Sequence, residues 1–409
     1  MRMLKLREED GAVLVHTAIA IVALLGFAAL SIDYGVLWVA RRQAQNAADS
    51  AALAAAISLA FGDPSDTDRI RAVAEGVGET NLVWGEAPEI DPATDVTIGP
   101  CPPNTPGDPD LCVKVDVYRN QARGNALPTF LANLVGVSEQ GVRASATAQV
   151  AQGAKATCVK PWAIPDKWSE LTPTSSPWDL NDTFDRYDTT GNPSKWTLLS
   201  PADYYVPPSA GSAGSGFTVP GDVGMRVRLK VENWKDSDIG PGNVRAVVLP
   251  GGCGSSGGST YECNIATCNP TPLGIGDVIE TEPGVMVGPT THGLDTLIGG
   301  DTTYWECANG SPASPTQDCF GAPSASGSPR LVPVPAFNVQ KYMEDAVAGL
   351  TKPNGRTDVT VTRILGFFIE GWDSKEIWGR FTYYPDSGGI TNGAVDENAN
   401  FLRKVILVR

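Results

Sequence analysis

The first forty residues carry the strongest hydrophobic pattern in the chain. A charged leader over residues 1–11 precedes an apolar segment over residues 12–40. Up to Leu30 only His16 and Thr17 are polar, and a helix from the start of the segment to Leu30 would be ~28 Å long, close to the thickness of a bilayer core. No small-residue cleavage site follows a short apolar core, so we expect a transmembrane anchor and not a cleaved secretory signal.

The apolar segment continues into an alanine-rich run that has no helix-breaking residue before Gly62, Asp63 and Pro64. Alanine is the strongest helix former, so we predict one helix over residues 12–59 that runs through the membrane and out of it. A second helix follows, capped by Asp66 or Asp68, with apolar residues at helical spacing.

Short strand-like runs replace the helical pattern in the next segment. Apolar and polar residues alternate over residues 95–98 and 113–118, which predicts two strands. A short helix over residues 128–134 is expected to lead to a strand over residues 142–150. The sequence therefore predicts an α+β fold for residues 41–150, with a stalk and a small head of helix, antiparallel sheet and helix.

Residues 158–409 show short apolar runs among many turn-forming residues, and the whole chain of 409 residues has 44 glycines and 32 prolines. This composition predicts a mostly β, loop-rich domain, either a sandwich or barrel-like. Residues 209–216 and 251–259 are expected to be flexible loops. We predict strands over residues 225–231, 244–249, 278–279, 331–334, 359–370, 378–384 and 405–408.

All eight cysteines follow the apolar segment, lie in loop-rich sequence and form no CxxC pair. An even number in this setting is typical of disulfides in an oxidising compartment, with unpaired buried thiols as the alternative. The leader carries three basic residues and the far side of the span carries Arg41 and Arg42, which slightly favours a cytoplasmic N-terminus. We expect the pairs Cys101–Cys112, Cys253–Cys263, Cys307–Cys319 and Cys158–Cys268, because the first three close short loops.

The formal net charge of −15 at pH 7 argues against nucleic acid and against an anionic membrane surface as partners.

Several short motifs stand in order along the N-terminal third. They are Gly11–Val13, Ala29–Gly35, Gln45–Leu53, Leu127–Leu131, Leu134–Val137 and Ala144–Ala148. In this order they resemble the TadE/TadG-like family of tight-adherence (Flp-type) pilus assembly proteins, over about residues 11–150. The resemblance implies a pilin-like head, and residues 158–409 look like the long ectodomain that some TadG-like proteins carry.

The resemblance also raises the question of processing at Gly11. Pilins and pseudopilins are cut after a glycine and carry a glutamate five residues further on, whereas this chain has His16 at that position. An imidazole does not supply the negative charge, so we expect a permanent anchor. We expect Asp33, near the outer end of the span, to lie at the membrane interface, with contact to a partner helix as the alternative, because a carboxylate facing lipid is costly.

An acidic loop is the strongest candidate for metal binding. Oxygen ligands recur every two or three residues at Asp179, Asn181, Asp182, Asp185 and Asp188, and calcium prefers such ligands. The loop lacks the glycine and glutamate of an EF-hand, so a solvated acidic loop is the alternative. No other cofactor is expected.

Catalytic signals are weak. Ser256 lies in a literal G-x-S-x-G string, but its flanks are a glycine–serine loop, and His292 is the one histidine outside the apolar segment. The acidic pairs Glu280/Glu282 and Asp373/Glu376 are the candidates for a hydrolase.

We therefore expect a non-enzymatic, single-pass anchor or scaffold of a tight-adherence pilus system in the cytoplasmic membrane. Its ectodomain would lie in the periplasm or outside the cell. Other pilus assembly proteins and membrane helices are the expected partners, with homo- or hetero-oligomers possible. The alternatives are a processed minor pseudopilin or adhesin displayed on the filament, and an ectodomain hydrolase.

Overall fold

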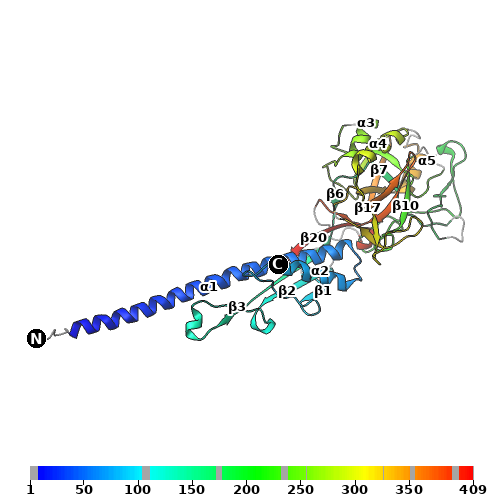
Figure 1. The fold of residues 1–409 in the computed structure, drawn as a ribbon. Helices are drawn as coiled ribbons and strands as arrows, with labels where there is room; N and C mark the ends of the chain where they lie inside the picture. Colours follow the sequence, from blue (N-terminus) through cyan, green and yellow to red (C-terminus); the bar gives the residue numbers. More distant parts are fainter. Residues whose placement is uncertain are drawn as a thin grey trace, which may run out of the picture.

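The computed structural model describes residues 8–103, 111–171, 177–231, 238–254, 256–325, 327–350, 355–388 and 396–408. It has three parts: a long helical rod, a small head packed along the distal half of the rod, and a larger β-rich ectodomain beyond its end (Figure 1). The mixed α+β class predicted from the sequence is confirmed.

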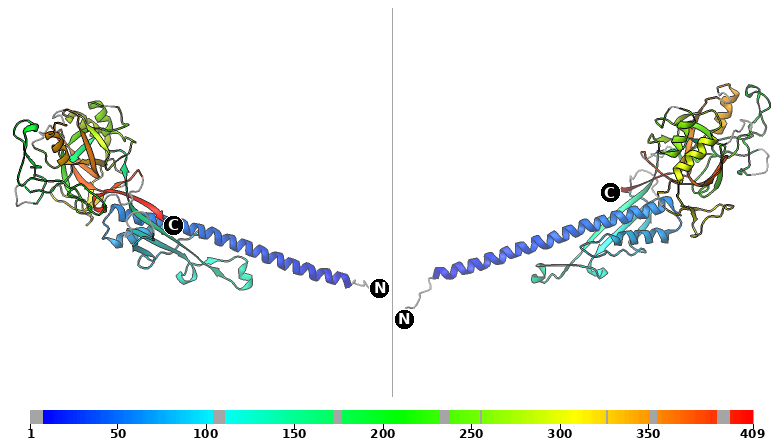
Figure 2. Two further views of the ribbon diagram at one scale, coloured as in Figure 1. Left: turned by 180° about the vertical axis from the view of Figure 1, so that it is seen from behind. Right: turned by 45° about the horizontal axis from the view of Figure 1, so that its top comes forward.

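The rod is α1 (Glu8–Phe61), which has 54 residues. Figure 2 shows it as one long helix whose N-terminal half projects away from the rest of the chain. It ends where Gly62, Asp63 and Pro64 interrupt the alanine-rich pattern, and the Gly62 N–H donates to the Ser58 carbonyl at 3.1 Å. Among the described residues, α1 is the one helix long and apolar enough to cross a membrane.

The second helix, α2 (Thr67–Thr80), returns along α1. Asp66 caps it, because its carboxylate accepts a hydrogen bond from the Arg69 N–H at 3.1 Å. A Cβ on Gly78 would lie 2.2 Å from Ile90 Cδ1 and 3.2 Å from the Cβ of Ala51. The glycine therefore leaves room for the Ile90 side chain and lets α2 lie close to Ala51 of α1.

The head sheet has the order β1-β2-β5-β20-β19. Its central strand, β5, is paired along both edges and packs against α1. All neighbours are antiparallel except β19 and β20. The strands are β1 (Val96–Gly99), β2 (Cys112–Arg119), β5 (Val142–Gln152), β19 (Tyr384–Pro385) and β20 (Leu402–Val408).

The helix predicted over residues 128–134 is wrong. β3 (Leu127–Pro128) and β4 (Glu139–Gln140) form a hairpin, and only the 3₁₀ turn η2 (Ala132–Val135) lies at its tip. Gly136 ends this turn with φ of 90°, a conformation that favours glycine. So short a segment cannot nucleate an isolated α-helix. The head therefore has both its helices before its sheet.

The C-terminal strand does not belong to the ectodomain. β20 pairs with β5 from Arg403↔Gln152 to Val408↔Thr147, whereas the sequence placed residues 405–408 within the unit of residues 158–409. Val405 and Leu407 pack against the head core, which is why the strand returns. The chain thus crosses between head and ectodomain more than once.

The ectodomain is built on a closed, barrel-like sheet. Its longest strand, β17, pairs with β16 along one edge and with β13 and β18 along the other, and β11 and β7 complete the ring. β10 extends the sheet from β18. The strands are β7 (Trp162–Pro165), β10 (Arg226–Lys230), β11 (Arg245–Val248), β13 (Val278–Thr281), β16 (Leu331–Phe337), β17 (Asp358–Trp372) and β18 (Glu376–Thr382).

Short elements surround this sheet. The helices, which were not predicted from the sequence, are α3 (Gly258–Ala266), α4 (Val287–Ile298) and α5 (Val339–Val347). The 3₁₀ turns here are η3 (Pro193–Lys195) and η4 (Glu397–Ala399), whereas η1 (Gln121–Arg123) lies in the head after β2. Two-stranded pairs are formed by β6 (Lys155–Ala156) with β12 (Leu273–Gly274), β8 (Tyr187–Asp188) with β9 (Thr197–Leu198), and β14 (Trp305–Cys307) with β15 (Gly321–Pro323).

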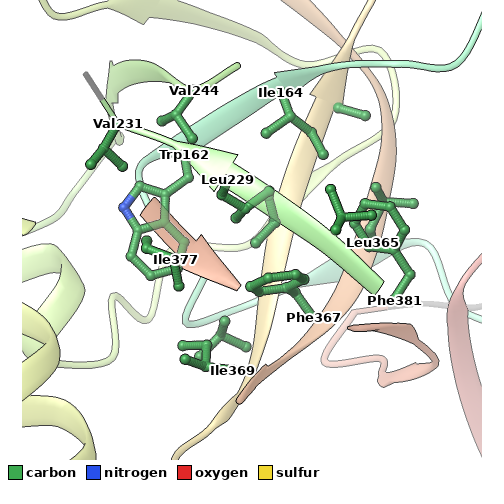
Figure 3. Packing of buried hydrophobic residues seen from close by; sticks show 14 of the residues in the cluster. Trp162, Ile164, Leu229, Val231, Val244, Leu365, Phe367, Ile369, Ile377 and Phe381 are labelled. Carbon is green, nitrogen blue, oxygen red and sulfur yellow. The ribbon is translucent and has the colours of Figure 1, made fainter. Parts of the chain in front are cut away.

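Large side chains fill the ectodomain core, among them Trp162, Leu229, Phe367 and Phe381 (Figure 3). Beside them the buried Asp166 carboxylate pairs with Arg363 and accepts hydrogen bonds from the Tyr205 hydroxyl at 2.7 Å and the Phe217 N–H at 3.0 Å.

The segment of residues 209–216 is attached to this core, although the sequence predicted a flexible loop. The Arg363 guanidinium, itself buried, donates to the carbonyl of Ala213. The other predicted flexible loop, residues 251–259, contains the start of α3 at Gly258.

Candidate functional site: the anchor helix and its head

The N-terminal half of α1 exposes large apolar side chains to its surroundings. Val22 is 70% exposed and Phe27 is 71% exposed, whereas such side chains are normally buried in a soluble protein. Up to Ile32 such positions occur on every side of the helix, whereas beyond it they lie on the face away from the head. The exposed positions before Asp33 are Val13, Leu14, Val15, Ile19, Ile21, Val22, Leu24, Leu25, Phe27, Leu30 and Ile32. Those after Asp33 are Tyr34, Trp38, Val39 and Ile57.

The second half of α1 buries one face in the head. From Asp33 onward, buried residues recur three or four positions apart, the spacing of one helix face. Nearly all of them are alanine, and they meet a further alanine stripe on β5, formed by Ala144, Ala146 and Ala148. Small side chains on both surfaces let helix and sheet approach closely. The buried helix positions include Val36, Ala40, Ala44, Ala47, Ala48, Ala51, Ala52, Ala55 and Ala56.

Asp33 stands where the two halves meet, and its side chain is 6% exposed. Its carboxylate accepts backbone hydrogen bonds from Phe130 at 2.7 Å, Leu131 at 3.1 Å and Ala132 at 2.6 Å. These N–H groups begin the η2 turn and have no partner within it, so the carboxylate satisfies them. Asp33 therefore fastens the β3–β4 hairpin to the rod. Its position at the membrane interface stays a prediction.

Two glutamines fix how far along the rod the head sits. The Gln43 Oε1 atom accepts the Trp84 N–H at 2.8 Å. The Gln45 amide donates to the Ser145 carbonyl on β5 at 3.1 Å and to Asp49 Oδ1 at 2.8 Å. A polar residue inside an alanine-rich face is the sequence signal for such contacts, and the sequence analysis did not use it.

Comparison with known proteins bears on this same helix. Residues 11–58 match the family model described as "Putative Flp pilus-assembly TadE/G-like". The N-terminal helix is similar to this family over residues 11–58, which we call the TadE/G-like segment. The resemblance found in the sequence is thus confirmed for α1, and it links the chain to Flp pilus assembly. No curated protein and no solved structure matches the chain significantly.

The TadE/G-like segment covers both halves of α1, the exposed apolar half and the half packed in the head. Together with the length and apolar character of the helix, the match indicates a single-pass membrane protein associated with pilus assembly.

Four disulfides stiffen the chain outside the rod, in the pairs expected from the sequence. Cys101–Cys112 closes the connection between β1 and β2 in the head, and Cys158–Cys268 ties the start of the ectodomain to the residues after α3. Cys253–Cys263 holds the first turns of α3, and Cys307–Cys319 lies beside the β14–β15 pair. Short closures of this kind contribute about 3 kcal/mol each in the chain-entropy model.

The acidic loop proposed for calcium uses its carboxylates in local turns. Asp179 accepts the Asn181 N–H at 2.6 Å, Asp182 accepts the Asp179 N–H at 2.5 Å, and Asp188 accepts the Thr190 N–H at 3.1 Å. Within the described ranges no three carboxylate, cysteine or histidine groups converge on one point.

Burial raises the pKa of Asp185, and the carboxylates of Asp203, Asp182 and Asp238 raise it further. A bound cation would relieve this repulsion between the carboxylates. Calcium binding therefore stays a prediction.

The acidic pairs considered for catalysis form ion pairs and turns. Glu280 and Glu282 both pair with Arg356, at 2.9 and 3.3 Å. Backbone N–H groups of Lys375 and Glu376 donate to Asp373 and lower the pKa of its carboxyl, which is the opposite of what a general acid needs.

The histidine considered for a nucleophile pair lies at the surface. His292 on α4 is 3.7 Å from Glu262, and its side chain is 69% exposed. Ser256 lies at the surface of the turn before α3, and no contact between Ser256 and His292 is found among the described residues. Among the described residues, neither the two acidic pairs nor Ser256 with His292 forms an arrangement that indicates hydrolysis.

One open cleft of the ectodomain holds arginines that are already paired. It has a volume of about 280 Å³ and is lined by Trp305, Trp378 and two arginines. In it Arg226 pairs with Glu370 at 2.6 Å and Arg330 pairs with Asp301 at 3.0 Å. These contacts explain the arginines as parts of the fold.

Proposed function

We propose that this chain is a non-enzymatic, membrane-anchored component of a tight-adherence (Flp) pilus assembly system. It acts as an anchor or scaffold that holds the head and the ectodomain outside the cytoplasmic membrane. The observation that carries the proposal is the division of the TadE/G-like helix at Asp33, with an exposed apolar half before it and a head-packed half after it.

Topology follows from two features. Four disulfides lie beyond the span, which fits an oxidising compartment for the head and ectodomain. The charged leader, with three basic residues, then remains in the cytoplasm. Other pilus assembly proteins, reached through the ectodomain or the span, are the proposed partners.

Intact-mass measurement of the native protein in two fractions, washed membranes and sheared filaments, tests the proposal. Full-length protein confined to the membranes is the expected result. A species beginning at Ala12 and recovered with the filaments would contradict a permanent anchor. It would favour a processed subunit of the filament despite His16.

Calcium is tested separately, because the anchor function does not depend on it. If the acidic loop binds calcium, millimolar Ca²⁺ raises the melting temperature of the full chain relative to a chelator, and Asp185→Asn removes the increase. An unchanged melting temperature would leave the loop as a set of hydrogen-bonded turns.

A further inference from the structure

The β3–β4 hairpin is the part of the head that reaches furthest toward the exposed half of α1. Both views in Figure 2 and the view in Figure 1 show it pointing back along the rod toward the N-terminus. The Asp33 carboxylate holds its tip at that level through the three backbone hydrogen bonds described above.

The tip of this hairpin is unusually apolar for a surface loop. Residues 130–137 read Phe-Leu-Ala-Asn-Leu-Val-Gly-Val, with one polar side chain. Phe130 is 54% exposed and Val137 is 49% exposed. The Thr129 N–H donates to Ser138 and its hydroxyl donates to Val137, so the two arms meet beside these exposed side chains.

The depth of the tip follows from the length of the exposed half of α1. Val13 to Ile32 would span about 30 Å as a helix, which is the thickness of the hydrocarbon core. Asp33 then lies at the boundary on the side of the head, and the hairpin tip lies at the same level. Tyr34 and Trp38 are exposed just beyond Asp33, and such aromatic side chains are enriched at this interface.

We propose that the hairpin tip is a second membrane contact. Phe130 and Val137 insert into the headgroup and upper acyl region of the head-side leaflet, while the Asp33 carboxylate is shielded by the backbone it binds. The inference rests on the proposed membrane anchoring. The contact is apolar, so it does not conflict with the acidic net charge of the chain.

Two points of attachment have a mechanical consequence. A single transmembrane helix can rotate about its axis and tilt, because tilt is set by contacts at its ends and with neighbours. A hairpin fixed to α1 and resting on the same leaflet restricts both motions. The ectodomain would then face a defined direction relative to the membrane.

Spin labels on single added cysteines test this contact in the full-length protein in liposomes, prepared without reductant so that the four disulfides stay closed. Val137→Cys probes the tip. Val278→Cys is the matched control, since Val278 is 59% exposed on β13 in the ectodomain. Val22→Cys probes the transmembrane half of α1. Accessibility of each label to oxygen and to a water-soluble nickel chelate is compared by power saturation.

Labels at Val22 and Val137 are expected to favour oxygen, and the label at Val278 is expected to favour nickel. A tip label that behaves like the Val278 label, with Val22 still in lipid, would overturn the inference and leave the anchor intact. Water-like behaviour at all three positions would overturn the anchor as well.

A tip label protected from both reagents would also overturn the proposal, because it would mean that a protein covers the hairpin. Phe130→Cys repeats the test on the other arm of the hairpin. The result then does not depend on whether the spin label at residue 137 disturbs the local structure. Intact mass confirms for each variant that four disulfides are present.

Discussion

The two halves of α1 differ in the size of their apolar side chains and in what those side chains contact. Before Asp33 the helix presents valine, leucine, isoleucine and phenylalanine on all sides, and little of the chain covers them. After Asp33 one face is almost entirely alanine and is buried against β5 and α2. Large side chains suit a lipid environment, and small ones allow close packing within the protein.

The comparison teaches that hydrophobicity alone does not locate the point at which α1 begins to pack against protein. The sequence predicted a span of residues 12–40 because apolar residues continue past Asp33. The burial of Val36 and Ala40 in the head shows that the last part of this segment faces protein on one side. The contact of Asp33 with the hairpin marks the change.

The largest expected effect comes from charge in the exposed half. Val22→Arg with Leu25→Arg places two cations near the bilayer centre, at a cost of roughly 2.5–3.5 kcal/mol each. We expect most of the protein to leave the carbonate-resistant membrane fraction. Ile57→Arg, on the exposed face of the other half, is the control and should stay in the membrane. If the double variant and Ile57→Arg remained in the membrane fraction to the same extent, the two halves of α1 would not differ in their environment.

The same substitution in each half gives the next effect. Ala48→Phe overfills the contact between α1 and the sheet and should destabilise the head by about 1–3 kcal/mol. Ala23→Phe lies in the exposed half and should change nothing. Hydrogen exchange of the β5 amides in the reconstituted protein measures both. Faster exchange in the Ala23 variant would mean that this half also packs against protein.

Removing the carboxylate at the junction should loosen only the hairpin. Asp33→Ala leaves the N–H groups of Phe130, Leu131 and Ala132 without their acceptor, so their exchange should speed up by roughly tenfold or more. Asp33→Asn keeps one acceptor oxygen and should show a smaller change. Unchanged exchange in the alanine variant would contradict the role of Asp33 as the fastening point.

The smallest effect concerns how tightly α2 follows the packed half. Apart from its chain neighbours and the backbone of its own helix, Gly76 has no atom within 4 Å of the position that a Cβ would take. Gly76→Ala should therefore stabilise α2 by roughly 0.5–1 kcal/mol through helix propensity. At Gly78 the same change meets Ile90 and Ala51, so its gain should be smaller or reversed. Hydrogen exchange of the α2 amides measures the stability of both variants. An equal increase in stability for Gly76→Ala and Gly78→Ala would argue against close packing of Gly78 on Ile90 and Ala51.

The sequence predicted the elements that a strong local pattern defines. The bounds of α1 and the strands β1, β2 and β5 lie close to the expected ranges, and α2 begins after the expected cap Asp66. Three of the cysteine pairs also follow a local rule, because short loops close more easily than long ones, and Cys158–Cys268 is the pair that then remains.

The sequence could not predict features that depend on distant residues. β20 has an ordinary strand pattern, and only its pairing with β5 assigns it to the head. The helices α3 and α4 are held by tertiary contacts, such as Tyr261 with Thr290, rather than by strong helix formers. Asp33 contacts backbone groups that lie almost one hundred residues away, so no local sequence pattern predicts this contact.

The central claim is that α1 passes from lipid to protein at Asp33. Labelling of single added cysteines by a membrane-impermeant maleimide in intact liposomes tests it most directly, at Ile21, Phe27, Trp38 and Ile57. All four side chains are exposed in the chain itself. The account predicts that the first two stay unlabelled and that the last two react. Reaction at all four positions, or protection that continues to Ile57, would contradict it.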